Sequence, residues 1–166
     1  MGRIGTSGHL DIGKSEHPEI WTSKNRTAVI GEIRKSKAEL GTGNERQGMS
    51  LDKHQELRKR TKDFALRIIK MCRTMPSTRE TNIINNQILR SATGMAANYR
   101  AVGLARSKAE FVSKLGVVVE EADETVFWLE LLGDSGIVRA SRLRELLAEG
   151  NQLVAIFLAS RKTARS

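Results

Sequence analysis

Aromatic residues, prolines and cysteines are all scarce in this chain of 166 residues. Aromatic side chains make up only 4% of it and there are two prolines, which argues against a turn-rich β-sandwich and favours helices. The single cysteine, Cys72, excludes an intramolecular disulfide and any zinc site built from several cysteines. No apolar run approaches the roughly 18 to 20 residues that cross a bilayer, and the N-terminus lacks a signal-peptide core. We therefore expect a cytoplasmic protein without a membrane partner.

Positive charge is what the chain has in excess, with a formal net charge of +9. Residues 1–48 contain eight of the fourteen glycines and carry eight basic and six acidic side chains, a net charge of +2. Residues 49–166 carry 20 basic and 13 acidic side chains, so the remaining +7 belongs there. We predict one folded domain over 49–166 and a poorly structured extension over 1–48, in which Ala28 to Leu40 is the only helix-like stretch.

The extension has a second interpretation, in which its start is wrongly assigned. The five residues before Met49 are Asn-Glu-Arg-Gln-Gly, and all of their codons can be purine-rich, as in a bacterial ribosome-binding site. We hypothesise that the natural start is Met49. The N-terminal mass of protein from the native host tests this, because a species that begins at Met1 contradicts it.

From Leu51 onward the apolar residues recur at helical spacing, with breakers between the segments. This pattern predicts a first helix from about Leu51 to Thr74, and a second that ends near Gly103. Three capping signals predict where the later helices start: the capping boxes Ser77–Glu80 and Ser107–Glu110, and Ser141 before the fourth helix. Because the loops are short, we expect an all-α, antiparallel, up-down-up-down four-helix bundle.

Two features of the predicted bundle suggest that it associates with other subunits. The third helix is apolar over more than one face, and such excess surface in a small bundle usually meets another chain. Charge is also segregated: residues 49–90 carry ten basic and four acidic side chains, whereas residues 110–134 carry one basic and seven acidic ones. We hypothesise that these opposed charges set the register of identical chains in a ring.

No constellation in the domain predicts catalysis. The acidic run of the third helix offers carboxylates, but a di-iron bundle also needs Glu-x-x-His motifs, and the domain holds one histidine, His54. Cys72 lies on the apolar seam of the first helix, where we expect a buried core thiol. There is no phosphate loop or nucleophile elbow. We predict that the protein is not an enzyme and uses no metal or cofactor.

Basic residues on the first helix are the strongest functional indication. Several aligned subunits would multiply the net +7 into a surface that binds phosphate electrostatically, with weak sequence specificity because the helix lacks aromatic platforms. The alternative is a solvated helix that pairs with the acidic third helix. The candidate nucleic-acid-binding residues are Arg58, Lys59, Arg60, Lys62, Arg67, Lys70 and Arg73.

A polar segment in the second helix is unusual for a helix interior. Asn98 and Arg100 flank Tyr99, and each would be costly to bury without a partner, so we expect them to meet the acidic third helix. A ligand site is the alternative. The full set of candidate assembly or polar-network residues is Asn98, Tyr99, Arg100, Glu120, Glu121, Asp123, Glu124 and Trp128.

Three motifs occur in order along the domain: Leu89–Ala101 (LRSATGMAANYRA), Ala105–Gly116 (ARSKAEFVSKLG) and Glu120–Leu132 (EEADETVFWLELL). With these motifs the sequence from about Leu51 to Arg165 resembles the bacterial 23S rRNA-intervening sequence proteins. It is also similar to the accessory variability protein of diversity-generating retroelements. One departure is that Gly94-Met95-Ala96 stands where the commoner family pattern has a proline, so the resemblance does not by itself imply a kink there.

The resemblance implies a homo-oligomeric bundle, characteristically a pentamer with a basic surface, and no known catalysis. It places Asn98, Tyr99 and Arg100 in the mid-helix motif, and Glu120, Glu121, Asp123 and Glu124 in the acidic motif, as packing and assembly elements. The partners that it implies are further copies of the chain, RNA or DNA, and a protein such as a reverse transcriptase. We therefore expect either a nucleic-acid-binding oligomer or, as the alternative, a protein-interaction scaffold.

Overall fold

The computed structural model describes residues 43–166, and their side chains from Lys53 onward. Four helices account for nearly all of this part, and it contains no strand. They are α2 (Gly43–Cys72), α3 (Arg79–Val102), α4 (Lys108–Asp134) and α5 (Ala140–Arg165). The predicted all-α fold is confirmed.

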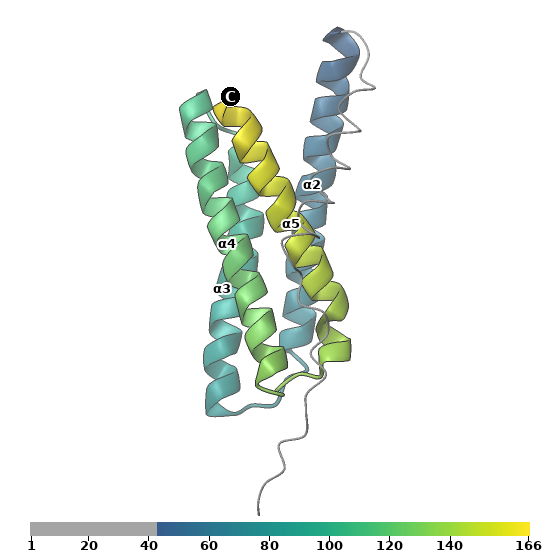
Figure 1. The fold of residues 1–166 in the computed structure, drawn as a ribbon, viewed down its shortest axis with the longest axis vertical. Helices are drawn as coiled ribbons and strands as arrows, with labels where there is room; N and C mark the ends of the chain where they lie inside the picture. The colour runs from purple at the N-terminus through teal and green to yellow at the C-terminus, as the bar shows by residue number, and fades with distance from the viewer. Residues whose placement is uncertain (1–42) are drawn as a thin grey trace, which may run out of the picture.

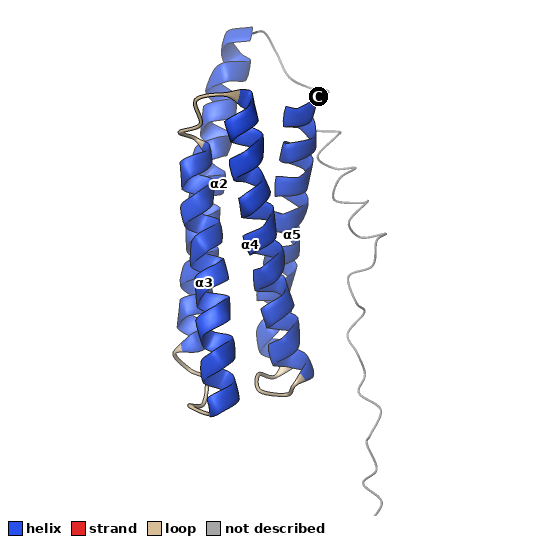
Figure 2. Cartoon of the chain, turned by 90° about the vertical axis from the view of Figure 1, so that its left-hand side faces the viewer, coloured by secondary structure: helices blue, strands red, loops and turns tan. Residues whose placement is uncertain are grey.

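The helices form an up-down-up-down bundle with short connections at its ends (Figures 1 and 2). Consecutive helices are neighbours, and α5 returns to pack against α2. Within the described residues α2 and α4 do not pack against each other, so they occupy opposite corners. This arrangement excludes pairing between the basic first helix and the acidic third helix inside one subunit.

Helix α2 begins eight residues earlier than the predicted Leu51 and ends two residues before the predicted Thr74. Its N-terminal turns extend past the ends of the other helices in Figure 1. The helix therefore takes in residues 43–48 of the predicted extension, and Met49 falls inside it. The rest of that extension, with the helix-like stretch Ala28 to Leu40, lies outside the described residues.

Of the three predicted helix caps, one is confirmed and two are wrong. Ser107 caps α4 as expected, because its side chain accepts a hydrogen bond from the backbone N–H of Glu110 at 3.1 Å. The Glu110 carboxylate reaches back one residue further than in a standard capping box, to the backbone N–H of Arg106 at 2.7 Å. This contact lowers the pKa of Glu110.

The other two predicted caps are wrong. Helix α3 is capped by Thr78 and not by Ser77, since the Thr78 hydroxyl accepts the backbone N–H of Thr81 at 3.2 Å. Helix α5 begins at Ala140 without a side-chain cap, and Ser141 lies within its first turn. Both errors move a boundary by one or two residues and leave the topology unchanged.

The core runs along the axis of the bundle and draws large apolar side chains from all four helices. Its largest fully buried members include Phe64, Ile68, Ile88, Met95, Leu115, Leu129, Leu143 and Phe157. Cys72 belongs to it as predicted, and burial raises the pKa of its thiol to about 11, which makes it an unreactive core thiol. Among the described residues no helix is long and apolar enough to span a membrane.

Gly150 sets how closely three of the helices approach one another. A Cβ atom on this residue of α5 would lie 2.9 Å from Val126 Cγ2 on α4 and 3.3 Å from Phe64 Cζ on α2. The missing side chain therefore lets α5 sit against both neighbours at once. With α2 held in this way, its outward face is fixed relative to α5.

Candidate nucleic-acid interface

The seven basic candidates lie on α2 or, in the case of Arg73, directly after it. Three of them have an acidic partner, three exposed ones have none, and Arg58 lies apart from both sets. Arg60 is committed to α5: its guanidinium binds the Glu149 carboxylate through Nε at 2.6 Å and Nη2 at 2.9 Å. The same Nη2 donates to Gln152 Oε1 at 2.6 Å. The hydrogen bond from Glu149 raises the pKa of Arg60. Arg60 therefore joins two helices, and its charge is already matched.

Two further candidates have acidic partners as well. Arg67 Nη2 lies 3.2 Å from Glu145 Oε2 of α5, and Glu145 is one turn before Glu149. Lys59 Nζ lies 3.0 Å from Asp63 Oδ2 on its own helix. Both pairs are exposed, so each contributes about 0.2 to 1 kcal/mol and is weakened by salt.

Lys62, Lys70 and Arg73 form the group without acidic partners. All three are exposed, and no ion pair holds any of them within residues 53–166. Their spacing places them on one outward face of the helix, and Leu66, which is 50% exposed, lies among them. We call Lys62, Lys70 and Arg73 the α2 stripe. Arg58, half-buried, lies off this face, where its charge acts on His54 and Tyr99.

The sequence patterns did not indicate that Arg142 of α5 lies at the C-terminal end of this face of α2. Arg142 Nη2 of α5 donates to the Thr74 hydroxyl at 2.9 Å, which brings the start of α5 beside the end of α2. Arg142 is 68 residues from Thr74 in the sequence, so no local pattern joins them. The signal that was available is the topology, because an antiparallel fourth helix must start where the first one ends.

The mid-helix segment of α3 makes its one side-chain hydrogen bond in the described residues to α2. Tyr99 is buried against α2 and α5: its hydroxyl lies 3.1 Å from His54 Nδ1, and its ring centroid lies 5.2 Å from that of Phe157. Burial raises the pKa of Tyr99 to about 12. Asn98 is half-buried and Arg100 is exposed, and in the described part of the chain neither bonds to α4. The polar contact that the structure does show for this segment is therefore with α2, through Tyr99.

The acidic helix α4 instead contacts α3 through a different arginine. Glu124 Oε1 forms an ion pair with Arg90 Nη2 at 2.6 Å. The same oxygen accepts a hydrogen bond from the indole N–H of Trp128 at 3.1 Å. This cluster ties two of the candidate assembly residues, Glu124 and Trp128, to their own subunit. Glu120 and Asp123 are exposed beside it.

Glu121 occupies a notch that Gly94 leaves open in α3. A Cβ atom on Gly94 would lie 3.0 Å from the Glu121 carboxylate, so any larger residue would displace it. The Oε2 atom is buried without a hydrogen-bond partner. Burial raises the pKa of Glu121, an effect that Arg90 opposes and that Glu124 and Glu120 add to. No group of three potential metal ligands forms among the described residues.

An exposed apolar face on α4 confirms that its apolar surface extends beyond one stripe. Phe127 is 52% exposed, Val117 40% and Leu131 36%. The Phe127 ring meets Trp128 edge-on, with centroids 4.9 Å apart. We call Val117, Phe127 and Leu131 the α4 apolar face. Helical spacing places the three on one side of α4, with Glu120 and Glu124 between Val117 and Phe127, and exposed apolar side chains on one side of a helix suit an association surface.

Comparisons with known proteins agree with this fold. A family model described as 23S rRNA-intervening sequence protein matches residues 53–159. A crystal structure of a protein of unknown function from the S23 ribosomal protein family of Bacteroides thetaiotaomicron VPI-5482 is 28% identical, with a TM-score of 0.60. That match covers 63% of this chain and 97% of the other. A search of curated proteins found no match.

Proposed function

The chain belongs to the 23S rRNA-intervening sequence protein family, and from that premise we propose that it is a non-catalytic, homo-oligomeric protein that binds nucleic acid electrostatically. Neither the family description nor the similar structure names an enzyme activity. We propose that the protein contacts the phosphates of the nucleic acid and does not recognise its base sequence.

The α2 stripe is the observation that carries this proposal. Lys62, Lys70 and Arg73 point outward with no acidic partner in the described residues, whereas Arg60 and Arg67 are neutralised by α5. Unpaired cations on one helical face can each contact a phosphate and release a counterion. Arg142 extends the positive surface at the lower end of the stripe.

We propose that the α4 apolar face joins identical chains into a closed ring, which the resemblance described above gives as a pentamer. The face lies on the corner opposite α2, so assembly through α4 leaves the α2 stripes facing outward. Repetition of the stripe around a ring would raise affinity for a long polyanion without new contacts.

The test of nucleic-acid binding is a titration with RNA and DNA at two salt concentrations. We expect the triple variant K62Q/K70Q/R73Q to bind more weakly to every sequence, with the salt slope reduced by about 1 for each lost contact. The matched control removes three exposed cations elsewhere, as R106Q/R144Q/K162Q, and we expect a smaller loss. Equal losses in the two variants, or no binding at low salt, would contradict the proposal.

The test of assembly is the mass in solution, measured by light scattering. We expect wild type to be a multiple of the 18.4 kDa chain and F127S/L131S to dissociate. The matched control is L104S, which also removes an exposed apolar side chain, 76% exposed, and should leave the oligomer intact. A wild-type protein with the mass of one chain would contradict homo-oligomerisation.

The α4 apolar face also favours a second candidate function, a scaffold that binds a different protein. Its apolar centre beside the exposed Glu120 and Asp123 would suit a basic, amphipathic partner such as a retroelement reverse transcriptase. A reverse-transcriptase gene with template and variable repeats next to this gene would favour the scaffold. A monomeric protein whose α4 face is needed for binding to that enzyme would do the same.

A further inference from the structure

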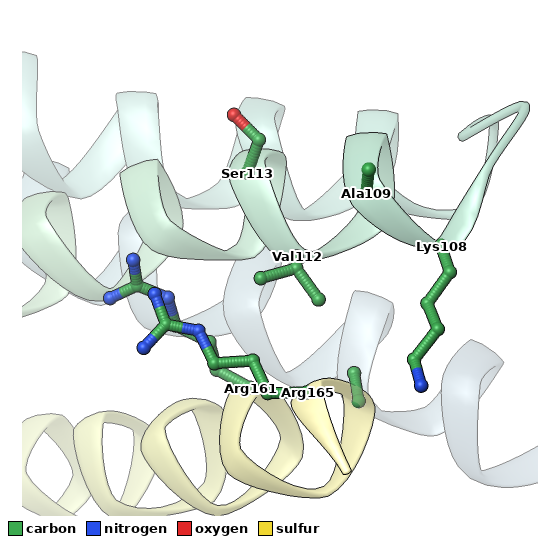
Figure 3. Close-up of a pocket in the computed structure, with 7 residues that line it drawn as sticks. Lys108, Ala109, Val112, Ser113, Arg161 and Arg165 are labelled. Carbon is green, nitrogen blue, oxygen red and sulfur yellow. The ribbon is translucent and has the colours of Figure 1, made fainter.

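A groove between α4 and α5 contains a second group of unpaired cations, far along the sequence from the α2 stripe. It has a volume of about 620 Å³ and lies where the first turns of α4 meet the last turns of α5. Lys108, Ala109, Val112 and Ser113 line it from α4, and Arg161, Ala164 and Arg165 line it from α5. Figure 3 shows the two guanidinium groups to the left of Val112 and the Lys108 side chain at the right-hand end.

The lining carries three positive charges and no negative one. No ion pair holds Lys108, Arg161 or Arg165 within residues 53–166, although the neighbouring Lys114 pairs with Glu110 at 3.5 Å. Like charges that line one groove repel one another, and an anion bound between them removes that cost. The groove therefore has the electrostatics of an anion site.

Arg161 is held in place by packing. Its guanidinium lies over Gly116 of α4, where a Cβ atom would come within 3.1 Å of Nη2 and 3.2 Å of Cζ. Its Nε atom is buried and has no hydrogen-bond partner. A guanidinium that is fixed in this way loses little freedom when a ligand binds to it.

The chemistry of the lining narrows the class of anion. Guanidinium groups bind phosphate through paired N–H donors. The floor is apolar, from Ala109, Val112 and Ala164, and Ser113 supplies the one hydroxyl in the lining. Such a floor suits a flat heterocyclic body better than a sugar rich in hydroxyls, and the volume falls in the range of small-molecule sites.

We propose that this groove binds a nucleoside phosphate monoester, with the phosphate on Arg161 and Arg165 and the base on the apolar floor. The monoester has two sources, a free mononucleotide or the 5′-phosphorylated end of a strand. This site is separate from the α2 stripe, because α2 lies diagonally across the bundle from α4 and contributes no residue to the groove. Binding of nucleotide in the groove therefore does not depend on binding of nucleic acid by the α2 stripe, and a failure of one leaves the other open to test.

Calorimetric titration with adenosine 5′-monophosphate tests the site directly. We expect wild type to bind the monophosphate and not adenosine, and R161Q/R165Q to bind at least tenfold more weakly. R144Q, an exposed cation on the same helix outside the groove, should bind within twofold of wild type. Absence of binding by wild type at millimolar nucleotide, or equal binding by the double variant, would overturn the proposal.

The variant Gly116→Ala tests whether nucleotide binding depends on the position of Arg161 or only on the positive charge of the groove. This change leaves the net charge unaltered, but the added Cβ atom would lie 3.1 Å from Arg161 Nη2, so the guanidinium has to shift from its present position. We expect nucleotide binding to fall at least fivefold while the circular dichroism spectrum stays that of a folded bundle. Unchanged affinity in a folded G116A protein would show that the position of Arg161 does not matter, and would overturn the proposed site.

Two oligonucleotides distinguish the sources of the phosphate. A 5′-phosphorylated strand that binds at least tenfold more tightly than its 5′-hydroxyl counterpart, with the difference lost in R161Q/R165Q, identifies a strand end. Binding of the mononucleotide without that preference identifies the free nucleotide. Both results support the site. K62Q/K70Q/R73Q should bind the mononucleotide like wild type, even where it no longer binds long nucleic acid.

Discussion

The Tyr99 hydroxyl lies 3.1 Å from His54 Nδ1, so the polar segment Asn98–Arg100 of α3 is anchored to α2. The other ring nitrogen of His54, Nε2, is buried and has no partner. Burial, together with the nearby charge of Arg58, lowers the pKa of His54 below its ordinary value of 6.5. The folded protein therefore favours the neutral imidazole.

Stability should decrease on mild acidification because of this pair. The unfolded chain takes up a proton on His54 near pH 6.5, whereas the folded chain does so only at lower pH. We expect the free energy of unfolding to be constant above about pH 7 and to fall below pH 6.5, as measured by urea unfolding between pH 5 and 8. H54Q should flatten the profile over that range. A wild-type profile that is already flat there would contradict the assignment.

Tyr99→Phe tests the hydrogen bond itself. This change keeps the ring against Phe157 but leaves His54 Nδ1 without its partner, and we expect a loss of about 1 kcal/mol in the free energy of unfolding. In H54A, the same substitution should cost much less. An equal cost in both backgrounds would assign the effect to the packing of the ring.

Gly103 leaves space for His54, and filling that space should destabilise the bundle. A Cβ atom at Gly103 would lie 2.5 Å from His54 Nε2, while the backbone there is helical and accepts alanine without strain. We expect G103A to lower stability by about 1 to 3 kcal/mol through overpacking. In the H54A background the cost should disappear, and this double-mutant cycle isolates the contact. An undiminished cost in that background would point to the backbone.

Arg60 and Arg67 should differ in their structural contribution, although the sequence gives them the same character. Arg60 makes a bidentate, partly buried pair with Glu149, and we expect R60Q to lower the free energy of unfolding by about 1 to 2 kcal/mol. Arg67 makes a single exposed contact with Glu145, and R67Q should cost less than about 0.5 kcal/mol. Thermal unfolding of the two variants makes the comparison. A larger loss from R67Q would contradict it.

Removal of the negative charge of Glu121 should stabilise the protein. Because burial raises its pKa, the folded chain holds the Glu121 proton to higher pH than the unfolded chain, so the charged carboxylate costs stability at neutral pH. We expect E121Q to be slightly more stable than wild type at pH 7, and the gain to shrink as pH falls toward 4. The exposed Glu120 supplies the control, since E120Q should change stability little. A destabilised E121Q protein would contradict this reasoning.

The fold was predictable because its signals are local. The heptad-like spacing of Leu115, Val118 and Ala122 fixes the buried face of α4, and Ser107 marks its start. The α3 cap was misplaced by one residue because Ser77 and Thr78 are both good capping residues, and the sequence does not decide between adjacent candidates.

The functional surfaces were less predictable because they depend on contacts between distant residues. A run of basic residues does not indicate that Arg60 finds Glu149, 89 residues away, while Lys62 finds no acid within the described part of the chain. Arg161 of α5 has room in the groove because Gly116 of α4 lies opposite it. The sequence of neither helix alone indicates that these two residues meet. Pairing across helices therefore decides which cations remain available for a ligand.

The diagonal placement of α2 and α4 also gives the subunit an electric dipole across the bundle, perpendicular to the helix axes. Its positive end is the corner that bears the α2 stripe, and its negative end is the corner of the acidic helix. An approaching polyanion would turn such a molecule until α2 leads, before any contact forms. The arrangement thus favours fast, oriented encounters at low ionic strength, and it keeps the acidic corner turned away from the polyanion.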